Sequence, residues 1–415
     1  MKRRDFLSLS SLTVGGLCFA NASNTLAADW TQWRGPSRDG KLADTNWPDS
    51  ISPENCKQKW RVECGPSYSG PIVVGDRIFT TETKDKQFEV VKAIDRATGQ
   101  TVWEASWEGA MSVPFFAKSN GDWIRSTPAY DSGKLYVAGM RDVLVCLDAN
   151  SGKIDWKVDF VKELGTPLPD FGFVCSPLVD GNFVYVQAGG ALAKLDKTTG
   201  SILWRALEDG GGMNGSAFSS PALAVIGGKR QLVVQTRTTL AGVDENTGQK
   251  LWAKEIAAFR GMNILTPTFF GDAIFTSSYG GKSQLVNIKR DGNAWSTEEK
   301  WEYKAEGYMS TPVIIDGHAY LHLKNQRFTC INLSTGEAAW TTRPFGKYWS
   351  MVSSGDKILA LDANGTLFLI RANPTKYEQL ASMKLSDQEN WAHIAVSDQQ
   401  LVIRELKALS LWDWK

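Results

Sequence analysis

A few arginine, asparagine, tryptophan and histidine residues interrupt an otherwise repetitive sequence, and they are the side chains best suited to hold a ligand. They sit just before, or in place of, a recurring Ser/Thr-Pro pair: Arg125, Asn214, Asn263, Trp349, Trp391 and His393. Arginine, tryptophan and histidine at one opening would bind a small, flat anion by charge-assisted hydrogen bonds and ring contacts. The alternative is that these large side chains only fill space where the pattern is irregular.

Aromatic side chains form a second group of candidates. They lie in two long connections, residues 104–125 and 157–175, and we expect them near the surface: Phe115, Phe116, Trp123, Phe171 and Phe173. Exposed aromatic side chains on a rim are typical of a surface that binds a partner. The equal alternative is that they fold back over the protein and cap it.

Other chemistries find little support in the sequence. The three histidines lack the further ligands that a zinc site needs. No nucleophile elbow, phosphate-binding loop or calcium loop is present. We therefore predict no catalytic residue and no metal site. Five of the six cysteines remain once the predicted export signal, which holds Cys18, is removed, and five is an odd number. The spacing of Cys56, Cys64, Cys146, Cys175 and Cys330 predicts no disulfide framework.

The elements that position the candidates follow one repeated pattern. It consists of Ser/Thr-x-Pro, two apolar strands of which the second ends in Asp, a Thr-Gly turn and a Trp. The clearest copy has Ser126–Pro128, Lys134–Val137, Val143–Asp148, Ser151-Gly152 and Trp156. Its tryptophan recurs at intervals between 39 residues (Trp301 to Trp340) and 53 residues (Trp103 to Trp156). This spacing leaves room for four short strands in each unit.

The pattern predicts an all-β, eight-bladed β-propeller of four-stranded antiparallel blades. Glycine supplies a positive φ in the hairpin turn, and tryptophan fills the space between neighbouring sheets. Four strands cannot bury both faces alone, so blades must pack around an axis. Trp60 precedes the first inner strand, so we expect residues 57–63 to form the outermost strand of the last blade and close the ring.

Small residues at the start of each inner strand should surround the mouth of the axial channel. They are Gly70, Thr127, Ser176, Ser220, Thr266 and Thr311. One interpretation is that their hydroxyls bind backbone groups where the strands crowd together. The other is that they form a polar funnel for a ligand.

The first 28 residues predict an export signal with Arg3 and Arg4 as a twin arginine, followed by an apolar stretch too short to span a bilayer. An ordinary secretory signal is the alternative. We expect an N-terminal extension over 29–56 and one propeller over 57–415, located in the periplasm or cell envelope. The nearly balanced charge, 46 Lys+Arg against 45 Asp+Glu, does not favour nucleic-acid binding.

The unit Asp-x-x-Thr-Gly-x-x-x-Trp, as in Asp95 to Trp103 and Asp244 to Trp252, resembles the repeat of pyrroloquinoline-quinone (PQQ)-type propellers. These include BamB-like and quinoprotein alcohol dehydrogenase-like proteins. The resemblance covers residues 57–414 and implies a fold rather than an activity. The family's enzymes hold PQQ and calcium with adjacent cysteines and a Glu, Asn and Asp set, which this sequence does not show. We therefore expect no cofactor and predict a non-catalytic scaffold with a protein partner in the cell envelope. The alternative is a PQQ-dependent or related oxidoreductase.

Overall fold

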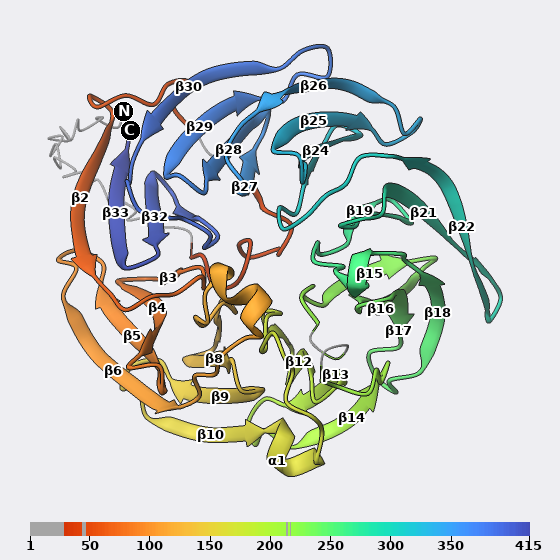
Figure 1. Ribbon diagram of the computed structural model, residues 1–415, viewed down its shortest axis with the longest axis horizontal. Helices are drawn as coiled ribbons and strands as arrows, with labels where there is room; N and C mark the ends of the chain where they lie inside the picture. Colours follow the sequence, from red (N-terminus) through yellow and green to blue (C-terminus); the bar gives the residue numbers. More distant parts are fainter. Residues whose placement is uncertain (1–28, 44–46, 213–214, 216) are drawn as a thin grey trace, which may run out of the picture.

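Eight β-sheets surround a central axis, as the repeat predicted (Figure 1). The structure is a computed structural model, and it describes residues 29–43, 47–212, 215 and 217–415. The predicted export signal, residues 1–28, and Asn214 lie outside the described residues. Each sheet is one blade whose strands follow one another from the axis to the rim, apart from the last blade and one added strand described below. The predicted eight-bladed β-propeller is confirmed.

The first four blades use four consecutive strands each. Blade 1 consists of β3 (Ile72–Val74), β4 (Arg77–Lys84), β5 (Phe88–Asp95) and β6 (Thr101–Glu108). Blade 2 consists of β7 (Ala129–Asp131), β8 (Lys134–Gly139), β9 (Val143–Asp148) and β10 (Ile154–Asp159). Blade 3 consists of β11 (Leu178–Asp180), β12 (Phe183–Ala188), β13 (Ala191–Asp196) and β14 (Ile202–Ala206). Blade 4 consists of β15 (Ala222–Ile226), β16 (Lys229–Gln235), β17 (Thr239–Val243) and β18 (Lys250–Glu255).

The last four blades complete the ring. Blade 5 consists of β19 (Thr268–Phe270), β20 (Ala273–Ser277), β21 (Ser283–Asp291) and β22 (Ala294–Tyr303). Blade 6 consists of β23 (Val313–Ile315), β24 (His318–His322), β25 (Arg327–Asn332) and β26 (Ala338–Pro344). Blade 7 consists of β27 (Trp349–Ser354), β28 (Lys357–Asp362), β29 (Thr366–Arg371) and β30 (Glu378–Lys384), with β1 (Lys41–Leu42) added in parallel beside β27. Blade 8 consists of β31 (Ala395–Ser397), β32 (Gln400–Glu405), β33 (Ala408–Trp414) and β2 (Cys56–Glu63).

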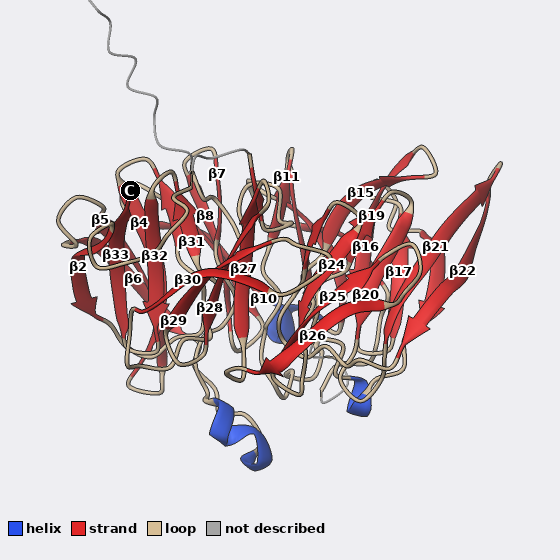
Figure 2. Ribbon diagram, turned by 90° about the horizontal axis from the view of Figure 1, so that it is seen from above, coloured by secondary structure: helices blue, strands red, loops and turns tan. Residues whose placement is uncertain are grey.

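Three short helical segments lie in connections between blades. They are η1 (Phe115–Asn120), α1 (Phe160–Leu164) and η2 (Phe259–Gly261). All three lie toward one end of the ring, and the C-terminus lies at the other (Figure 2). Among the described residues, no helix has the length and apolar character needed to cross a bilayer.

Most of the repeated tryptophans fasten their blade to the turn of the next one. In blade 1 the amide of Gly99 donates to the carbonyl of Asp95 (2.8 Å), and Gly99 has a φ of 76°. Trp60 of blade 8 lies against this glycine so closely that a Cβ there would be 2.8 Å from the indole Cδ2. The indole Nε1 of Trp60 also donates to the carbonyl of Arg96 (3.0 Å). Glycine is required both for the positive φ and for the approach of the ring.

The same contact recurs at other junctions. The indole rings face the turn glycines in these pairs: Trp103 with Gly152, Trp156 with Gly200, Trp204 with Gly248, and Trp301 with Gly336. Trp252 differs, because its Nε1 donates to Oε1 of Gln231 in its own blade (2.7 Å). Blade 5, the next blade, has no Thr-Gly turn and instead forms the long hairpin β21–β22. Loss of the turn and loss of this junction therefore occur together.

Strand β2 closes the ring by pairing antiparallel with β33, from Cys56 opposite Trp414 to Glu63 opposite Ala408. Trp60 pairs with Leu411, so the predicted closure by residues 57–63 is confirmed. Arg404 strengthens the junction between blades 8 and 1. It is 1% exposed, and it donates to the carbonyls of Gly65 (2.6 Å) and Thr81 (3.1 Å).

Deleting residues 50–64 should prevent the ring from closing. The deletion exposes the whole edge of β33, whose apolar residues are buried, and it removes the ring of Trp60. We expect loss of cooperative unfolding in near-ultraviolet circular dichroism, and recovery of it when a synthetic peptide of residues 47–64 is added. A truncated chain that melts at the same temperature as the full chain would show that the closure is unimportant.

A buried acid also connects blades 1 and 2. The carboxylate of Glu89, which is 0% exposed, accepts the amide N–H of Met140 in two contacts of 2.9 and 3.1 Å. Burial raises its pKa from 4.5 to about 8. Asp142 connects blades 2 and 3 in the same way, accepting the amide N–H of Gly189 (2.8 Å), and burial raises its pKa to about 7. Both acids hold a proton in the folded chain at pH values where the unfolded chain has released it.

The stability of the protein should therefore fall as the pH rises from about 4.5 to about 8. Glu89→Gln keeps an oxygen acceptor for Met140 but removes the titration, so it should lose part of this dependence, on the order of a few kcal/mol. Asp142 should supply the remainder. Urea unfolding at pH 5 and pH 8.5 measures the effect, and identical pH profiles for the variant and the parent would refute it.

Candidate functional site

The N-terminal segment, residues 29–43, fills the axial channel. It starts at blade 1, where Trp30 pairs with Val73, and the carbonyl of Thr31 accepts the amide N–H of Tyr130 (2.8 Å). It leaves at blade 7, where β1 pairs with β27. Figure 1 shows this red segment running across the centre of the ring. The segment enters at the end that carries the turns between the first and second strands of each blade.

Two buried arginines hold this segment in the channel. Arg34 donates through Nη2 to the carbonyl of Pro312 (2.6 Å), in blade 6. Arg38 donates to the carbonyls of Pro177 (2.7 Å) and Pro221 (3.2 Å), in blades 3 and 4. Burial lowers the pKa of each guanidinium to about 10, so both stay charged at neutral pH. The segment therefore brings two positive charges to the axis.

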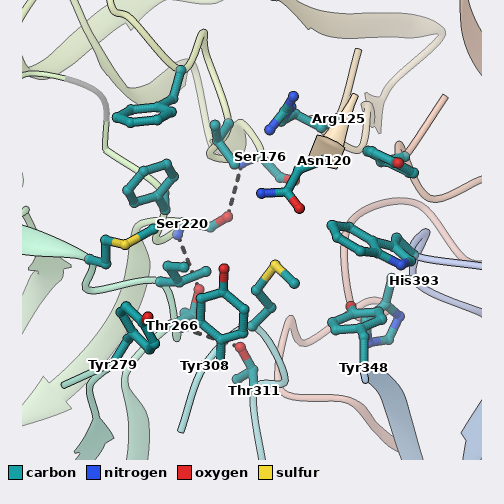
Figure 3. A pocket seen from close by; sticks show the side chains of 18 of the residues that line it. Asn120, Arg125, Ser176, Ser220, Thr266, Tyr279, Tyr308, Thr311, Tyr348 and His393 are labelled. Atoms are coloured by element: carbon teal, nitrogen blue, oxygen red, sulfur yellow. Dashed lines mark hydrogen bonds between the residues drawn. The ribbon is translucent and has the colours of Figure 1, made fainter. Parts of the chain in front are cut away.

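Trp33 lies between these arginines and forms the floor of a cavity. The Cζ atoms of Arg34 and Arg38 lie 5.6 and 5.9 Å from the centre of its indole ring. Its ring also meets that of His393 edge to face, at 6.1 Å. The cavity above it has a volume of about 370 Å³ (Figure 3), and its lining includes Phe116 of η1 and Phe259 of η2.

Aromatic side chains form most of the cavity wall. They come in neighbouring pairs whose ring centres are 5.0 Å apart for Tyr68–Trp391, 4.9 Å for Tyr279–Tyr308 and 5.7 Å for Phe171–Phe218. Phe116 of η1 and Phe259 of η2 continue the wall toward the opening. A flat apolar molecule would contact rings on several sides.

Hydroxyl side chains surround the base of the cavity; we call Thr127, Ser176, Ser220, Thr266 and Thr311 the hydroxyl ring (Figure 3). Each one accepts an amide N–H from the preceding blade. The distances are 3.0 Å from Gly70 to Thr127, 3.0 Å from Thr127 to Ser176, 2.9 Å from Ser176 to Ser220, 3.1 Å from Ser220 to Thr266 and 3.3 Å from Thr266 to Thr311. The interpretation that these hydroxyls bind backbone groups is confirmed.

At blades 7 and 8 the hydrogen bond between neighbouring blades runs in the opposite direction. The amide of Trp349 donates back to Oγ of Ser310 (3.1 Å), and that of Ile394 donates back to Oγ of Ser350 (3.2 Å). These are the two blades in which the Ser/Thr-Pro pattern is missing. Trp349, Trp391 and His393 thus lie where the circle of hydrogen bonds changes direction.

The charged side chains that line the cavity are all basic within the described residues: Arg125, Arg237 and Arg260. Arg125 is held by the carbonyls of Gly121 (2.7 Å) and Trp123 (3.2 Å). Arg237 lies 4.8 Å from the ring centre of Phe218, and its Nε donates to the carbonyl of Gly261 (2.6 Å). Burial lowers the pKa of both guanidinium groups without removing their charge.

Six of the candidate residues named from the sequence border the cavity: Phe116, Arg125, Phe171, Trp349, Trp391 and His393. Two of these behave differently from the expectation. The Trp349 side chain is fully buried and stacks on His322 and Phe368, both at 5.2 Å, so it supports the wall from behind. Burial, with Arg34 nearby, lowers the pKa of His393 to about 3, so this imidazole is neutral and brings no positive charge.

The other predicted residues do not line the cavity. Phe173 is 2% exposed and packs against Phe160, so the expectation that it lies near the surface is wrong. Its connection folds inward, as the capping alternative required. Asn263 is fully buried, and its Nδ2 donates to the carbonyls of Arg237 and Ile256, both at 3.0 Å. Trp123 contributes its carbonyl to Arg125 rather than its ring to the cavity.

Three phenylalanines remain exposed on the rim. Phe115 is 85% exposed, Phe116 is 47% exposed and Phe259 is 49% exposed. The first two belong to η1 and the third to η2. The surface prediction is confirmed for Phe115 and Phe116, while Phe171 is half-buried between Phe116 and Phe218.

Sequence reasoning missed Trp33, Arg237, Tyr279 and Tyr308. Arg237 and Tyr279 follow the second strand of their blades, and these connections end at the same face as the longer ones that were considered. The signal was present, because Arg237 directly follows an apolar strand. Trp33 lies outside the repeat, and only its proximity to two arginines in the sequence marked it.

Comparison with known proteins gives a consistent result. The family described as outer membrane protein assembly factor BamB matches residues 87–342. The protein of that name from Yersinia pestis is 22% identical over 289 residues, which cover 66% of this chain and 66% of that protein. The one from Moranella endobia is 22% identical over 378 residues, covering 84% and 80%. A polyvinylalcohol dehydrogenase from Sphingopyxis is 29% identical over 43% of this chain and 28% of its own length.

Solved structures show the same fold. BamB from Moraxella catarrhalis superposes with a TM-score of 0.62 at 15% identity, covering 87% of this chain and 98% of that chain. The computationally designed Ika8 protein superposes with a TM-score of 0.57 at 12% identity, covering 90% and 99%.

Replacing Arg38 with leucine should destabilise the protein by about 2 kcal/mol, because carbonyls in blades 3 and 4 lose a charged donor inside the channel. Urea unfolding measures the change. Arg343→Leu, at an exposed position near the end of β26, is the control and should change stability by less than about 0.5 kcal/mol. Equal stability of the two variants would mean that Arg38 does not hold the segment.

Proposed function

The chain belongs to the family described as outer membrane protein assembly factor BamB, and on that premise we propose that it is a non-catalytic scaffold of the cell envelope that binds a protein partner through the end of the ring carrying η1 and η2. The relatives named for outer-membrane protein assembly support this role and this location. The export signal predicted over residues 1–28 agrees with it.

The exposed phenylalanines on η1 and η2 are the observation that favours this end of the ring. Phe115 and Phe116 lie on one connection and Phe259 on another, and all three are at least 47% exposed. Exposed aromatic side chains grouped on a rim lose water-exposed area when a partner covers them, which is typical of residues that dominate a binding energy. The large apolar side chains of comparable exposure elsewhere are Val225 (65%), Leu203 (50%) and Val102 (45%), and they lie singly on blades 4, 3 and 1.

The cavity residues do not favour catalysis by the groups they offer. His393 is neutral, and it has no carboxylate beside it in the described lining. Cys175 is fully buried, and burial raises the pKa of its thiol to about 12, far from a reactive thiolate. The described residues therefore offer a weak base in His393 and no activated thiol in Cys175.

The cofactor set of the quinoprotein relatives does not fit these residues. Calcium needs several carboxylate or amide oxygens, and the described lining has no carboxylate and the single amide of Asn120. In the described part of the chain no three His, Cys, Asp or Glu side chains come together as metal ligands. Adding pyrroloquinoline quinone and calcium to the purified protein tests the alternative. Tight binding with dye-linked alcohol oxidation would establish an oxidoreductase instead of a scaffold.

A photo-crosslinking amino acid at Phe115 should capture an envelope protein in cells, while the same amino acid at Val225 should not. The pair Phe115→Ser and Phe116→Ser should reduce this partner's co-purification at least about tenfold, equivalent to 1.4 kcal/mol, without lowering the melting temperature. Val225→Ser is the matched control and should leave co-purification unchanged. Crosslinking from Val225 rather than Phe115 would place the partner at the other end of the ring.

A further inference from the structure

We propose that the cavity above Trp33 binds one small organic anion, with its acceptor oxygens toward the hydroxyl ring and a flat apolar body between the aromatic walls. This goes beyond the scaffold role, because the protein partner would cover the rim while this ligand lies inside the channel. It does not depend on that role either. The inference rests on the unused hydrogen-bond donors, the charges and the shape of the cavity.

The hydroxyl ring has donors but no acceptors for them. Each of its oxygens already accepts one amide N–H, and within the described residues no side chain or carbonyl accepts the hydroxyl proton in return. The five side chains are 3 to 9% exposed, and all of them line the cavity. Buried donors are normally satisfied. An acceptor group in the cavity would meet these protons from several blades at once.

Positive charge surrounds this position. Arg38 lies directly behind the hydroxyl ring, since its Nη2 donates to the carbonyl of Ser176 (3.1 Å). The Cζ atom of Arg34 lies 5.6 Å from the centre of the Trp33 ring, and Arg125, Arg237 and Arg260 line the wall. Buried guanidinium groups interact with an anion through a medium that screens less than water does. The acceptor group is therefore expected to carry a negative charge.

The acids near these arginines stand outside the cavity lining. Each acid attracts the charge of a neighbouring guanidinium group and so opposes the lowering of its pKa by burial. The pairs are Asp39 with Arg34, Asp122 and Glu89 with Arg125, and Asp170 and Asp209 with Arg237. Burial raises the pKa of Glu89 to about 8, which leaves this acid mostly neutral at pH 7. The charged side chains that face the cavity are thus basic, even though acidic side chains outside the lining offset part of their charge.

The upper part of the cavity favours a flat apolar body. The Tyr68–Trp391 and Tyr279–Tyr308 ring pairs line it, together with Met262 and Met309. A volume of about 370 Å³ is at the small end of the range for ligand sites, about 300 to 1,000 Å³, and suits a body of two or three rings. Methionine side chains adapt to bodies of different outline.

A neutral sugar fits these residues less well. Sugar hydroxyls must donate as well as accept, and carboxylates are the strongest acceptors for them. The described lining offers no carboxylate, and Asn120 supplies its single amide oxygen. An excess of donors over acceptors selects a ligand head that only accepts, such as a carboxylate, sulfonate or phosphate group.

A matched pair of fluorescent probes tests the proposal on the full protein. 1-Anilinonaphthalene-8-sulfonate is an anion with a flat apolar body, and N-phenyl-1-naphthylamine has nearly the same body without the charge. Calorimetric titration should give one site per chain for the anion, with an affinity at least about tenfold higher than for the neutral probe, equivalent to 1.4 kcal/mol. Raising the salt concentration should weaken only the anion.

Two variants remove charge from the cavity and one control removes it nearby. Arg125→Gln should weaken the anion at least about fivefold and leave the neutral probe within twofold. Arg260→Gln, at an exposed position, should have a smaller effect in the same direction and keeps the test valid if the Arg125 variant does not fold. Arg141→Gln, exposed at the same end of the ring but outside the lining, should change neither affinity.

Several outcomes would overturn the proposal. Equal affinity for both probes, or equal losses of both in Arg125→Gln, would show an apolar cavity without anion recognition. Many weak sites, or no saturable binding, would show that the cavity is no ligand site. A tenfold effect of Arg141→Gln would mean that only the overall charge of that end matters. Crosslinking from Phe115 reports on the protein partner separately, so either hypothesis can fail while the other stands.

Discussion

The contact between an indole ring and the turn glycine of the next blade is the interaction on which the ring depends. It needs a tryptophan at the start of the outer strand and, in the neighbouring sheet, a residue without Cβ in a left-handed conformation. Sheets with two apolar faces gain stability only when such neighbours are fixed beside them. Where the turn is missing, before blade 5, the tryptophan bonds within its own blade instead. The fold is thus a sequence of junctions rather than one common core, and several separate apolar clusters reflect this.

The channel is shaped by a part of the chain that does not belong to the repeat. Segment 29–43 passes between the inner strands, and Arg34 and Arg38 replace the partners that the carbonyls beside the axis would otherwise lack. Without this segment the ring would enclose an open passage. With it, the passage becomes a cavity that is closed at one end by Trp33 and lined at the other by aromatic rings. The site is therefore made by two structures: repeats that supply the wall, and a single segment that supplies the floor.

Much of the fold could be predicted from the sequence, because the repeat is a local pattern. Glycine turns, strand alternation and spaced tryptophans can each be recognised within a few residues. Trp60 indicated the closing strand because it precedes the first inner strand of the repeat. The cavity was predicted only in part. Arg125, Trp391 and His393 were found because they break the pattern, yet the charge state of His393 depends on burial that no local pattern shows. Phe173 looks the same as Phe171 in sequence, and only the path of its connection decides which of them turns inward. Trp33 was missed because it lies outside the repeat and because the cavity wall that it faces comes from residues distant in the chain, such as His393.

The pairing of β2 with β33 joins the two ends of the described chain, and this sets an order of events. A ribosome delivers β2 long before the strand it must pair with, so blade 8 can form only after the last strand has left the exit tunnel. Until then blade 1 lacks the neighbouring blade that covers one of its faces. The apolar side chains on that face remain exposed and can bind chaperones or other chains. Residues 29–64 supply both the cavity floor and the closing strand, so a cleavage after them that is followed by loss of the fragment would open the cavity and the ring together.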